Sequence, residues 1–236
     1  MTARYAIYYV PRPGTRLWDK ASAWLGADAY TGAAPARRPL PGLDALDLDA
    51  LTRDPRRYGF HATLKAPFEL APGRREAELL AAANQQATGL APFEVPIAPA
   101  DMGRFLAFEL QQPSLEMQAL HALCVRDFET FRAPLSDADL ARRRQVPLTS
   151  EQDARLVEWG YPYVLDEFHF HMTLTGSVRD EAVRTRLLAA LQDHFADETG
   201  PHLFDGLAVF KQDARQAPFR VLERFSFRGQ ASSIFR

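Results

Sequence analysis

The sequence is poor in cysteine and in long apolar runs. Its 236 residues contain one cysteine, Cys124, which excludes an internal disulfide and a cluster of thiolate metal ligands. Scarce cysteine suits a reducing compartment, so we expect a cytoplasmic protein. No run of about 18 apolar residues occurs, and the sequence predicts no contact with a membrane. The first apolar run ends at Pro11 and lacks the cleavage site of a signal peptide.

The chain also lacks a surplus of basic charge. Its 28 Lys and Arg residues stand against 30 Asp and Glu residues, which gives a formal net charge of −2. Proteins that coat RNA or DNA usually carry a basic excess, so we expect no bulk nucleic-acid binding. Arginines do cluster at 53–57 and at 142–144. We interpret the second cluster as a solvated surface.

One short motif is present twice. His-x-Thr-Leu occurs at 61–64 and at 171–174, each time directly after a phenylalanine. For six histidines and an ordinary threonine content, about 0.3 His-x-Thr triplets are expected by chance. Two copies with the same flanking residues therefore indicate a duplicated site.

Apolar periodicity, caps and turn residues predict the elements around the two motifs. The first half should contain strands at 4–11, 59–70, 93–98 and 104–111, helices at 15–26 and 74–90, and a long loop at 31–57 with one turn near 44–52. The second half should contain helices at 114–132, 137–159 and 179–195, and strands at 163–178, 202–212 and 219–229. We expect the helix at 137–159 to divide near Pro147 and to restart with Ser150 as its N-cap.

Each half thus places its motif strand before a helix and further strands. This repeated order indicates an internal duplication of architecture. We therefore expect one bilobal domain over 1–236, with motif-bearing halves 1–112 and 113–236.

Strand geometry sorts the side chains of the first motif onto two faces, because successive side chains alternate. His61, Thr63 and Lys65 share a polar face, whereas Phe60 points to the core. The histidine and the threonine lie about 7 Å apart along the strand.

The second motif strand repeats this arrangement. His169, His171 and Thr173 share its polar face, and Phe170 points to the core. If the two halves close face to face, both His-Thr pairs line one groove.

Such a groove has a clear chemical use. A histidine of ordinary pKa, about 6.5, can act as a general base or a general acid near neutral pH, and two histidines can take both roles together. Threonine hydroxyls and Lys65 can bind the non-bridging oxygens of a phosphoryl group. The pattern favours displacement at the phosphorus of a phosphodiester, above all a cyclic one.

These strands resemble the motifs of the two-histidine (2H) phosphoesterase superfamily. The longer strings RRYGFHATLKAPF and WGYPYVLDEFHFHMTLTG are similar to one largely uncharacterised branch, often encoded beside genes for phosphonate breakdown. The resemblance covers nearly the whole chain. It implies a bilobal α+β fold in which duplicated antiparallel sheets, related by a pseudo-twofold axis, carry outer helices and enclose a central groove.

The resemblance also implies an activity. It is metal-independent hydrolysis or transesterification of a cyclic phosphodiester or related nucleotide, with no cofactor. The motif positions make His61 and His171 the catalytic pair, and Thr63 and Thr173 the phosphate binders. His169 matches no position of the superfamily motif.

Five further residues are candidates for substrate contact, and His169 is one of them. Tyr8 lies in the first strand, which borders the groove in this family-like arrangement, although it also fits a core position. Arg57 precedes the first motif, and Arg104 and Lys211 lie near inner strands. The ligand expected is a small phosphate ester, such as a nucleoside cyclic phosphate or a cyclic sugar phosphate, and an RNA end is also compatible.

Two alternatives remain open at this stage. His169 and His171 form a His-x-His pair that could bind a metal together with His61, as in three-histidine zinc sites. A module that binds a nucleotide or phosphate ester without turning it over would use the same threonine and lysine side chains. Two matched histidines favour catalysis, since a binding site more naturally employs arginine.

Overall fold

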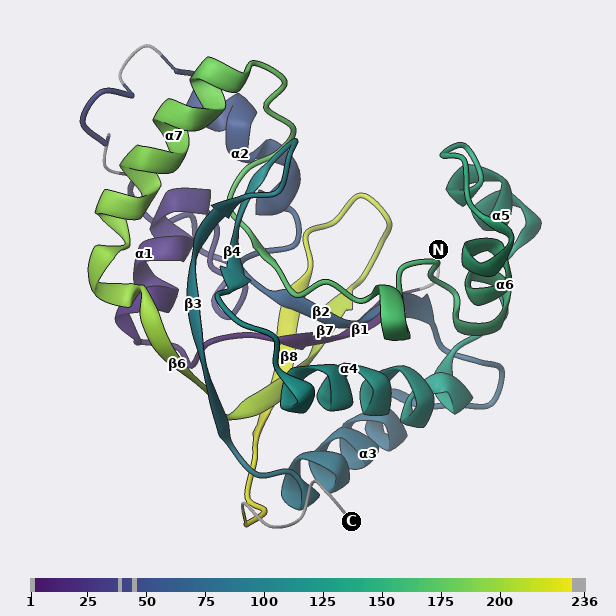
Figure 1. Ribbon diagram of the computed structural model, residues 1–236. Coiled ribbons are helices and arrows are strands. Elements are labelled where there is room, and N and C mark those ends of the chain that lie inside the picture. Colours follow the sequence, from purple (N-terminus) through teal and green to yellow (C-terminus); the bar gives the residue numbers. More distant parts are fainter. Residues whose placement is uncertain (1–2, 38–39, 44–45, 231–236) are drawn as a thin grey trace.

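The computed structural model describes residues 3–37, 40–43 and 46–230. Its centre is formed by two four-stranded sheets, and all pairings between the strands are antiparallel. Helices lie outside the sheets (Figure 1). This arrangement confirms the predicted α+β class with two antiparallel sheets and outer helices.

Each sheet combines strands from both halves of the sequence. The first sheet has the order β2-β1-β7-β8 and consists of β1 (Arg4–Tyr9), β2 (Ala62–Glu69), β7 (Gly206–Gln212) and β8 (Arg220–Ser226). The second has the order β5-β4-β3-β6 and consists of β3 (Phe93–Asp101), β4 (Leu106–Leu110), β5 (Met172–Thr173) and β6 (Gly200–Phe204). Strand β7 returns to pair with β1, and β6 returns to pair with β3, so each sheet contains strands from both motif-bearing halves.

The two motif strands occupy corresponding places. Strand β2 is an edge of the first sheet and β5 is an edge of the second. These two edges lie against each other at the centre of the molecule. The fold thereby brings together two motifs that are 110 residues apart, from residue 61 to residue 171.

The helices cover the outer faces of the sheets. They are α1 (Arg16–Leu25), α2 (Leu48–Arg56), α3 (Glu76–Gly89), α4 (Leu115–Asp127), α5 (Asp137–Arg143), α6 (Ser150–Trp159) and α7 (Glu181–His194), with 3₁₀ turns at Glu129–Phe131, Leu165–Glu167 and Ala196–Glu198. Helix α3 packs on β7 and β8, α4 on β2, and α7 on β3. Within the described ranges, no helix combines the length and apolar character that crossing a membrane requires.

Local sequence explains where several helices begin and end. The Thr15 side chain accepts a hydrogen bond from the Trp18 amide, and Gly26 ends α1 in the left-handed region at φ 69°, the conformation that favours glycine. Helix α6 begins one residue earlier than predicted, because Thr149 rather than Ser150 is the N-cap and forms a capping box with Gln152.

The loop predicted at 31–57 contains a full helix, α2, over Leu48–Arg56. Asp47 caps this helix by accepting a hydrogen bond from the Ala50 amide. Positions 44–45 of the predicted turn lie outside the described residues.

The strand predicted at 163–178 is mostly wrong, since only Met172–Thr173 pairs in a sheet. Its neighbouring backbone groups bond to other partners. The amides of Leu174 and Thr175 both donate to the carbonyl of Leu106, and the Gly176 amide donates to the carbonyl of Leu51. Such bonds satisfy the backbone without extending the ladder.

A continuous core joins the two sheets. Phe60 and Phe170 are both buried in it, as strand alternation predicted. The Phe60 ring packs edge-on against Phe108 of the second sheet, with centroids 5.9 Å apart. The Trp24 indole of α1 donates to the carbonyl of Leu174 at 2.8 Å. The first contact ties the first motif to the second sheet, and the second ties the backbone of the second motif to α1.

Candidate active site

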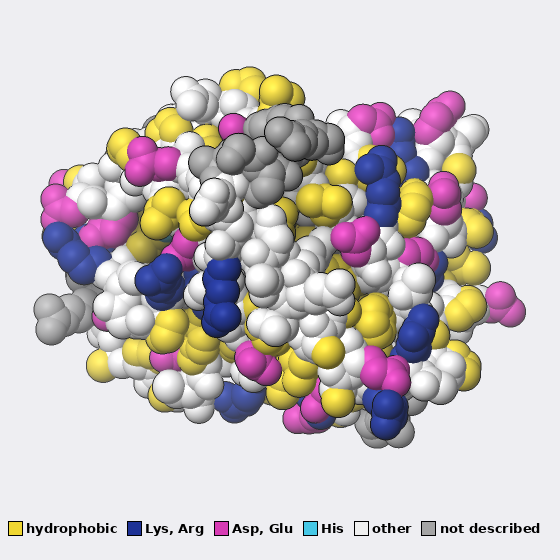
Figure 2. Space-filling view, turned by 90° about the horizontal axis from the view of Figure 1, so that it is seen from below, with side chains coloured by type: hydrophobic (Ala, Val, Ile, Leu, Met, Phe, Trp, Pro, Cys, Tyr) yellow, Lys and Arg dark blue, Asp and Glu magenta, His cyan; other side chains and the backbone are white. Residues whose placement is uncertain are grey.

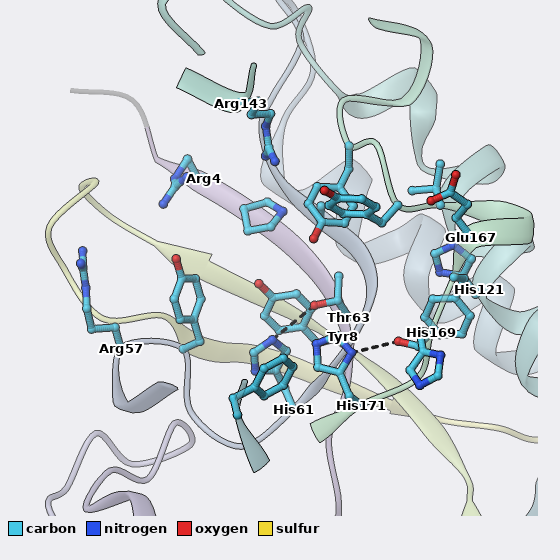
Figure 3. A pocket seen from close by; sticks show the side chains of 18 of the residues that line it. Arg4, Tyr8, Arg57, His61, Thr63, His121, Arg143, Glu167, His169 and His171 are labelled. Carbon is cyan, nitrogen blue, oxygen red and sulfur yellow. Dashed lines mark hydrogen bonds between the residues drawn. The ribbon is translucent and has the colours of Figure 1, made fainter. Parts of the chain in front are cut away.

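A cavity of about 950 Å³ lies where the two motif strands meet, within the size range of ligand pockets. His61 and Thr63 of the first motif line it, and so do His169 and His171 of the second (Figure 3). Tyr8 of β1 lies beside them. The predicted groove, with both histidines on its wall, is therefore present.

The two histidines are held in the same way. The Nδ1–H of His61 donates to the carbonyl of Gly59, and the Nδ1–H of His171 donates to the carbonyl of His169, each at 2.9 Å. A carbonyl can only accept, so each Nδ1 carries the proton and each Nε2 of the neutral ring keeps a free lone pair. In both motifs the acceptor is two residues before the histidine, so the repeated sequence produces a repeated tautomer.

Burial makes both rings weak bases. The His61 ring stacks on Tyr8 with centroids 3.9 Å apart, and burial together with the nearby His171 lowers its pKa to about 4. Burial also lowers the pKa of His171, and the adjacent His169 adds to this effect, whereas the carboxylate of Glu109 opposes it. The carboxylate therefore offsets part of the effect of burial on His171, but the pKa of both rings is lowered.

The two threonines are placed differently. The Thr63 hydroxyl lies 3.4 Å from Nε2 of His61 and lines the cavity. Thr173 is partly exposed and pairs with Ala107 of β4, but it is not among the cavity-lining residues. Thr63 can thus contact a bound phosphoryl group directly in this arrangement.

The prediction that Lys65 shares the groove face of β2 is wrong. Ile7 pairs with Lys65 whereas Tyr8 pairs with Thr63, so one step along β1 corresponds to two along β2. This bulge turns Lys65 to the opposite face, as a bulge re-aims the side chains that follow it. There Lys65 is buried, and its ammonium donates to Glu129 and to the carbonyl of Val125, each at 2.7 Å.

The other candidates divide into two groups. Tyr8, Arg57 and His169 line the cavity, and the His169 ring bonds to the carboxylate of Glu109 at 2.7 Å. Arg104 is exposed on the turn between β3 and β4 and does not line the cavity. Lys211 also lies elsewhere, in an ion pair with Glu76 at 2.8 Å.

Several lining residues were not predicted. Arg142 and Arg143, which we expected to form a solvated surface, line the cavity together with Arg4 and Tyr161. The arginine cluster is visible in the sequence. Its place over the groove depends on where α5 packs, which no local pattern shows.

The three histidines of the alternative metal site do not converge. The ring of His169 is hydrogen-bonded to the carboxylate of Glu109. Among the residues that the structure describes, no group of three His, Cys, Asp or Glu side chains is arranged to hold a metal ion.

The outer surface is mixed in charge. On the face seen in Figure 2, basic and acidic side chains are interspersed with apolar ones. This pattern fits the net charge of −2, and it differs from the lining of the cavity, where arginines gather.

Solved structures with a similar course of the chain have low identity. TT0787 of Thermus thermophilus is 18% identical, with a TM-score of 0.45, and the match covers 96% of this chain and 99% of that chain. E. coli LigT complexed with 3′-AMP is 12% identical, with a TM-score of 0.45, and the match covers 98% and 100%.

Curated relatives are closer in sequence. A protein of Janthinobacterium sp. (strain Marseille) named ribose 1,5-bisphosphate phosphokinase PhnN is 37% identical over 236 residues, which cover 96% of this chain and 51% of the relative. A protein of the same name from Laribacter hongkongensis (strain HLHK9) is 35% identical over 223 residues, or 92% of this chain and 50% of the relative. The chain thus spans about half the length of these relatives. The model of the family described as protein of unknown function (DUF1045) matches residues 63–220, and the chain therefore belongs to that family.

Proposed function

We propose that the protein is a phosphoesterase that opens a cyclic phosphodiester by acid–base catalysis with His61 and His171. One observation carries this proposal: the two histidines line a single cavity, and each is fixed through Nδ1–H so that Nε2 remains for a substrate. Two oriented imidazoles on either side of one bound group can move the two protons that hydrolysis of an ester requires.

We infer the two roles from the charges that lie near each ring. His61, whose pKa is lowered to about 4, is neutral over most of the pH range and serves as the base. Burial lowers the pKa of His171 as well, but the carboxylate of Glu109 opposes this effect, and His171 serves as the acid. When a phosphate anion binds between them, its charge raises both pKa values.

The reaction moves one proton at each histidine. Nε2 of His61 takes a proton from water as the water oxygen attacks phosphorus. The bond from phosphorus to the leaving oxygen breaks, and Nε2–H of His171 donates its proton to that oxygen. The hydroxyl of Thr63 donates to a non-bridging oxygen, where negative charge accumulates. Solvent then takes up the proton from His61 and donates a proton to His171.

The names of the curated relatives bear on the substrate but not on the reaction. The chain contains no G-x-x-x-x-G-K-[ST] loop, the usual phosphate cradle of nucleotide-dependent kinases, and we do not propose kinase activity for it. Ribose 1,5-bisphosphate in the relatives' name favours a phosphorylated pentose over other cyclic esters as the group to test first.

A panel of cyclic esters tests this proposal. Nucleoside 2′,3′-cyclic phosphates, a ribose cyclic phosphate and an RNA end with a 2′,3′-cyclic phosphate are incubated with the protein, and the products are identified by ³¹P NMR. We expect ring opening of at least one of these compounds to a monoester, at an unchanged rate in excess chelator. Turnover that chelator abolishes and zinc restores supports the metal alternative instead. Tight binding of a cyclic ester without any product supports the binding module.

A further inference from the structure

The cavity carries more positive charge than one phosphodiester needs. Five arginines line it, namely Arg4, Arg57, Arg142, Arg143 and Arg215, against one carboxylate, Glu167. That carboxylate is already paired with Arg155 at 2.9 Å. The lining is therefore strongly basic in a chain whose net charge is −2.

Two of the arginines have carboxylate partners and join two segments of the chain. Arg142 and Arg215 both pair with Asp139, at 2.6 and 2.8 Å. Arg215 and its hydrogen bonds hold the pKa of Asp139 well below its usual range, so this carboxylate stays charged. The bridge joins α5 to the segment between β7 and β8, and it holds the end of α5 over the cavity.

The other three lack such a partner. Over the described ranges, no ion pair joins a carboxylate to Arg4, Arg57 or Arg143. Arg4 donates only to the amide oxygen of Gln212, and Arg57 donates to the carbonyl of Arg215 and the amide oxygen of Gln216.

Arg143 is the least satisfied of these. Its Nε is buried without a hydrogen-bond partner, and its guanidinium lies over the ring of Tyr161, 5.2 Å from the centroid. Burial lowers the pKa of Arg143, and the positive charges of Arg142 and Arg4 lower it further. The carboxylate of Asp139 opposes this effect, but Asp139 is already bound by Arg142 and Arg215. Like charges gathered in a cavity cost free energy, and a bound anion lowers that cost.

We propose that Arg4, Arg57 and Arg143 form a second anion subsite, which binds a terminal phosphate monoester on the same molecule whose cyclic diester lies between the histidines. Guanidinium groups match phosphate oxygens in geometry, and three of them suit a tetrahedral dianion. Figure 3 shows the three arginines on one side of the cavity and His169 and His121 on the other, with His61 and His171 below. The volume of about 950 Å³ leaves room for a sugar between the two phosphates.

This inference rests on the proposed function for the position of the diester, but the subsite can be tested without turnover. Binding of ribose 5-phosphate to the His61→Ala/His171→Ala protein is measured by titration calorimetry. Adding Arg4→Gln and Arg143→Gln to this protein should weaken the binding about 10- to 100-fold, because such a loss is typical when a hydrogen bond to a charged group is removed. Arg144→Gln is the matched control, since this exposed neighbour pairs with Asp153 outside the cavity, and it should leave the affinity unchanged.

A turnover comparison identifies the class of the anion. For the wild type we expect adenosine 2′,3′-cyclic phosphate that carries a 5′-phosphate to have a kcat/KM at least tenfold above that of the 5′-hydroxyl form. The Arg4→Gln/Arg143→Gln protein should lose most of this preference, and the Arg144→Gln protein should keep it.

Three results overturn the subsite. The first is an equal kcat/KM for the two adenosine compounds. The second is that ribose 5-phosphate does not bind, or binds with an affinity that the arginine substitutions do not change. The third is a higher kcat/KM for a dinucleotide that ends in a 2′,3′-cyclic phosphate than for the 5′-phosphorylated adenosine compound. The last result points to an RNA end. If no cyclic ester is turned over while ribose 5-phosphate binds through the arginines, the proposed function fails and the subsite stands.

Discussion

The two copies of His-x-Thr-Leu lie in unequal surroundings. His61 precedes an eight-residue strand, β2, and its ring stacks on the buried ring of Tyr8. His171 precedes a two-residue strand, β5, and its ring meets Phe105 edge-on at 5.6 Å, with a glutamate-bonded histidine two residues away. Identical motifs therefore produce one histidine held in an apolar, stacked environment and one near a carboxylate. The difference teaches that a duplicated motif can place its two histidines in different electrostatic environments.

The largest expected effect tests whether both copies are needed. His61→Ala and His171→Ala should each reduce kcat about 10²- to 10⁴-fold on a cyclic ester that the wild type opens. The double variant should lose less than the product of the two losses, because residues that act as a unit are not additive. Circular dichroism of each variant controls for folding. If either single variant keeps full activity, the paired mechanism is wrong.

The threonines test the comparison next. Thr63→Ala should reduce kcat about 10- to 10³-fold, because it removes a hydrogen-bond donor to the negative charge that develops on the phosphoryl oxygens. Thr173→Ala should cost less, because Thr173 does not line the cavity. Thr63→Ser and Thr173→Ser keep the hydroxyl, so these variants should retain most of the wild-type kcat. Equal losses at the two positions imply that the second motif closes on the substrate more tightly than this structure shows.

The pH dependence of kcat/KM reports the free enzyme. Activity should fall at low pH, as His61, with a pKa lowered to about 4, becomes protonated and can no longer act as base. It should also fall at high pH, as His171 loses its proton, and burial lowers the pKa of that residue below its usual 6.5. Because both pKa values are lowered, the maximum should lie on the acidic side of neutrality. Initial rates from about pH 3.5 to 8 measure the rise and the fall of this pH profile. The two apparent pKa values obtained belong to the coupled pair of histidines. A maximum above about pH 7 contradicts this assignment.

The smallest expected effect concerns Glu109. Glu109→Gln removes the negative charge that favours protonated His171, so the limb at higher pH should move to lower pH by less than about one unit, the scale of a partly screened charge. The limb at lower pH should not move. His169→Ala is the companion variant, since His169 is the residue that Glu109 contacts. If Glu109→Gln moves the lower limb instead, the acid and base are exchanged.

Much of the architecture can be predicted from local sequence. Thr15 and Gly26 bound the first helix, and alternation places Phe60 and Phe170 in the core and their neighbouring histidines in the groove. The Nδ1 bonds to carbonyls two residues earlier are local as well. Cap, alternation and motif act over a few residues, so they can be predicted without knowing what packs nearby.

Other features depend on partners distant in the sequence, and only the tertiary structure decided them. The bulge that turns Lys65 away from the groove arises from the register between β1 and β2. The shortness of β5 follows from backbone bonds to Leu51 and Leu106. Arg143 reaches the cavity because the Asp139–Arg215 bridge holds α5 above it. Thus the sequence alone determined the two motifs and the local geometry of their histidines. Long-range register and packing decided which side chains meet, because no periodicity within a segment encodes the position of the segment that lies against it.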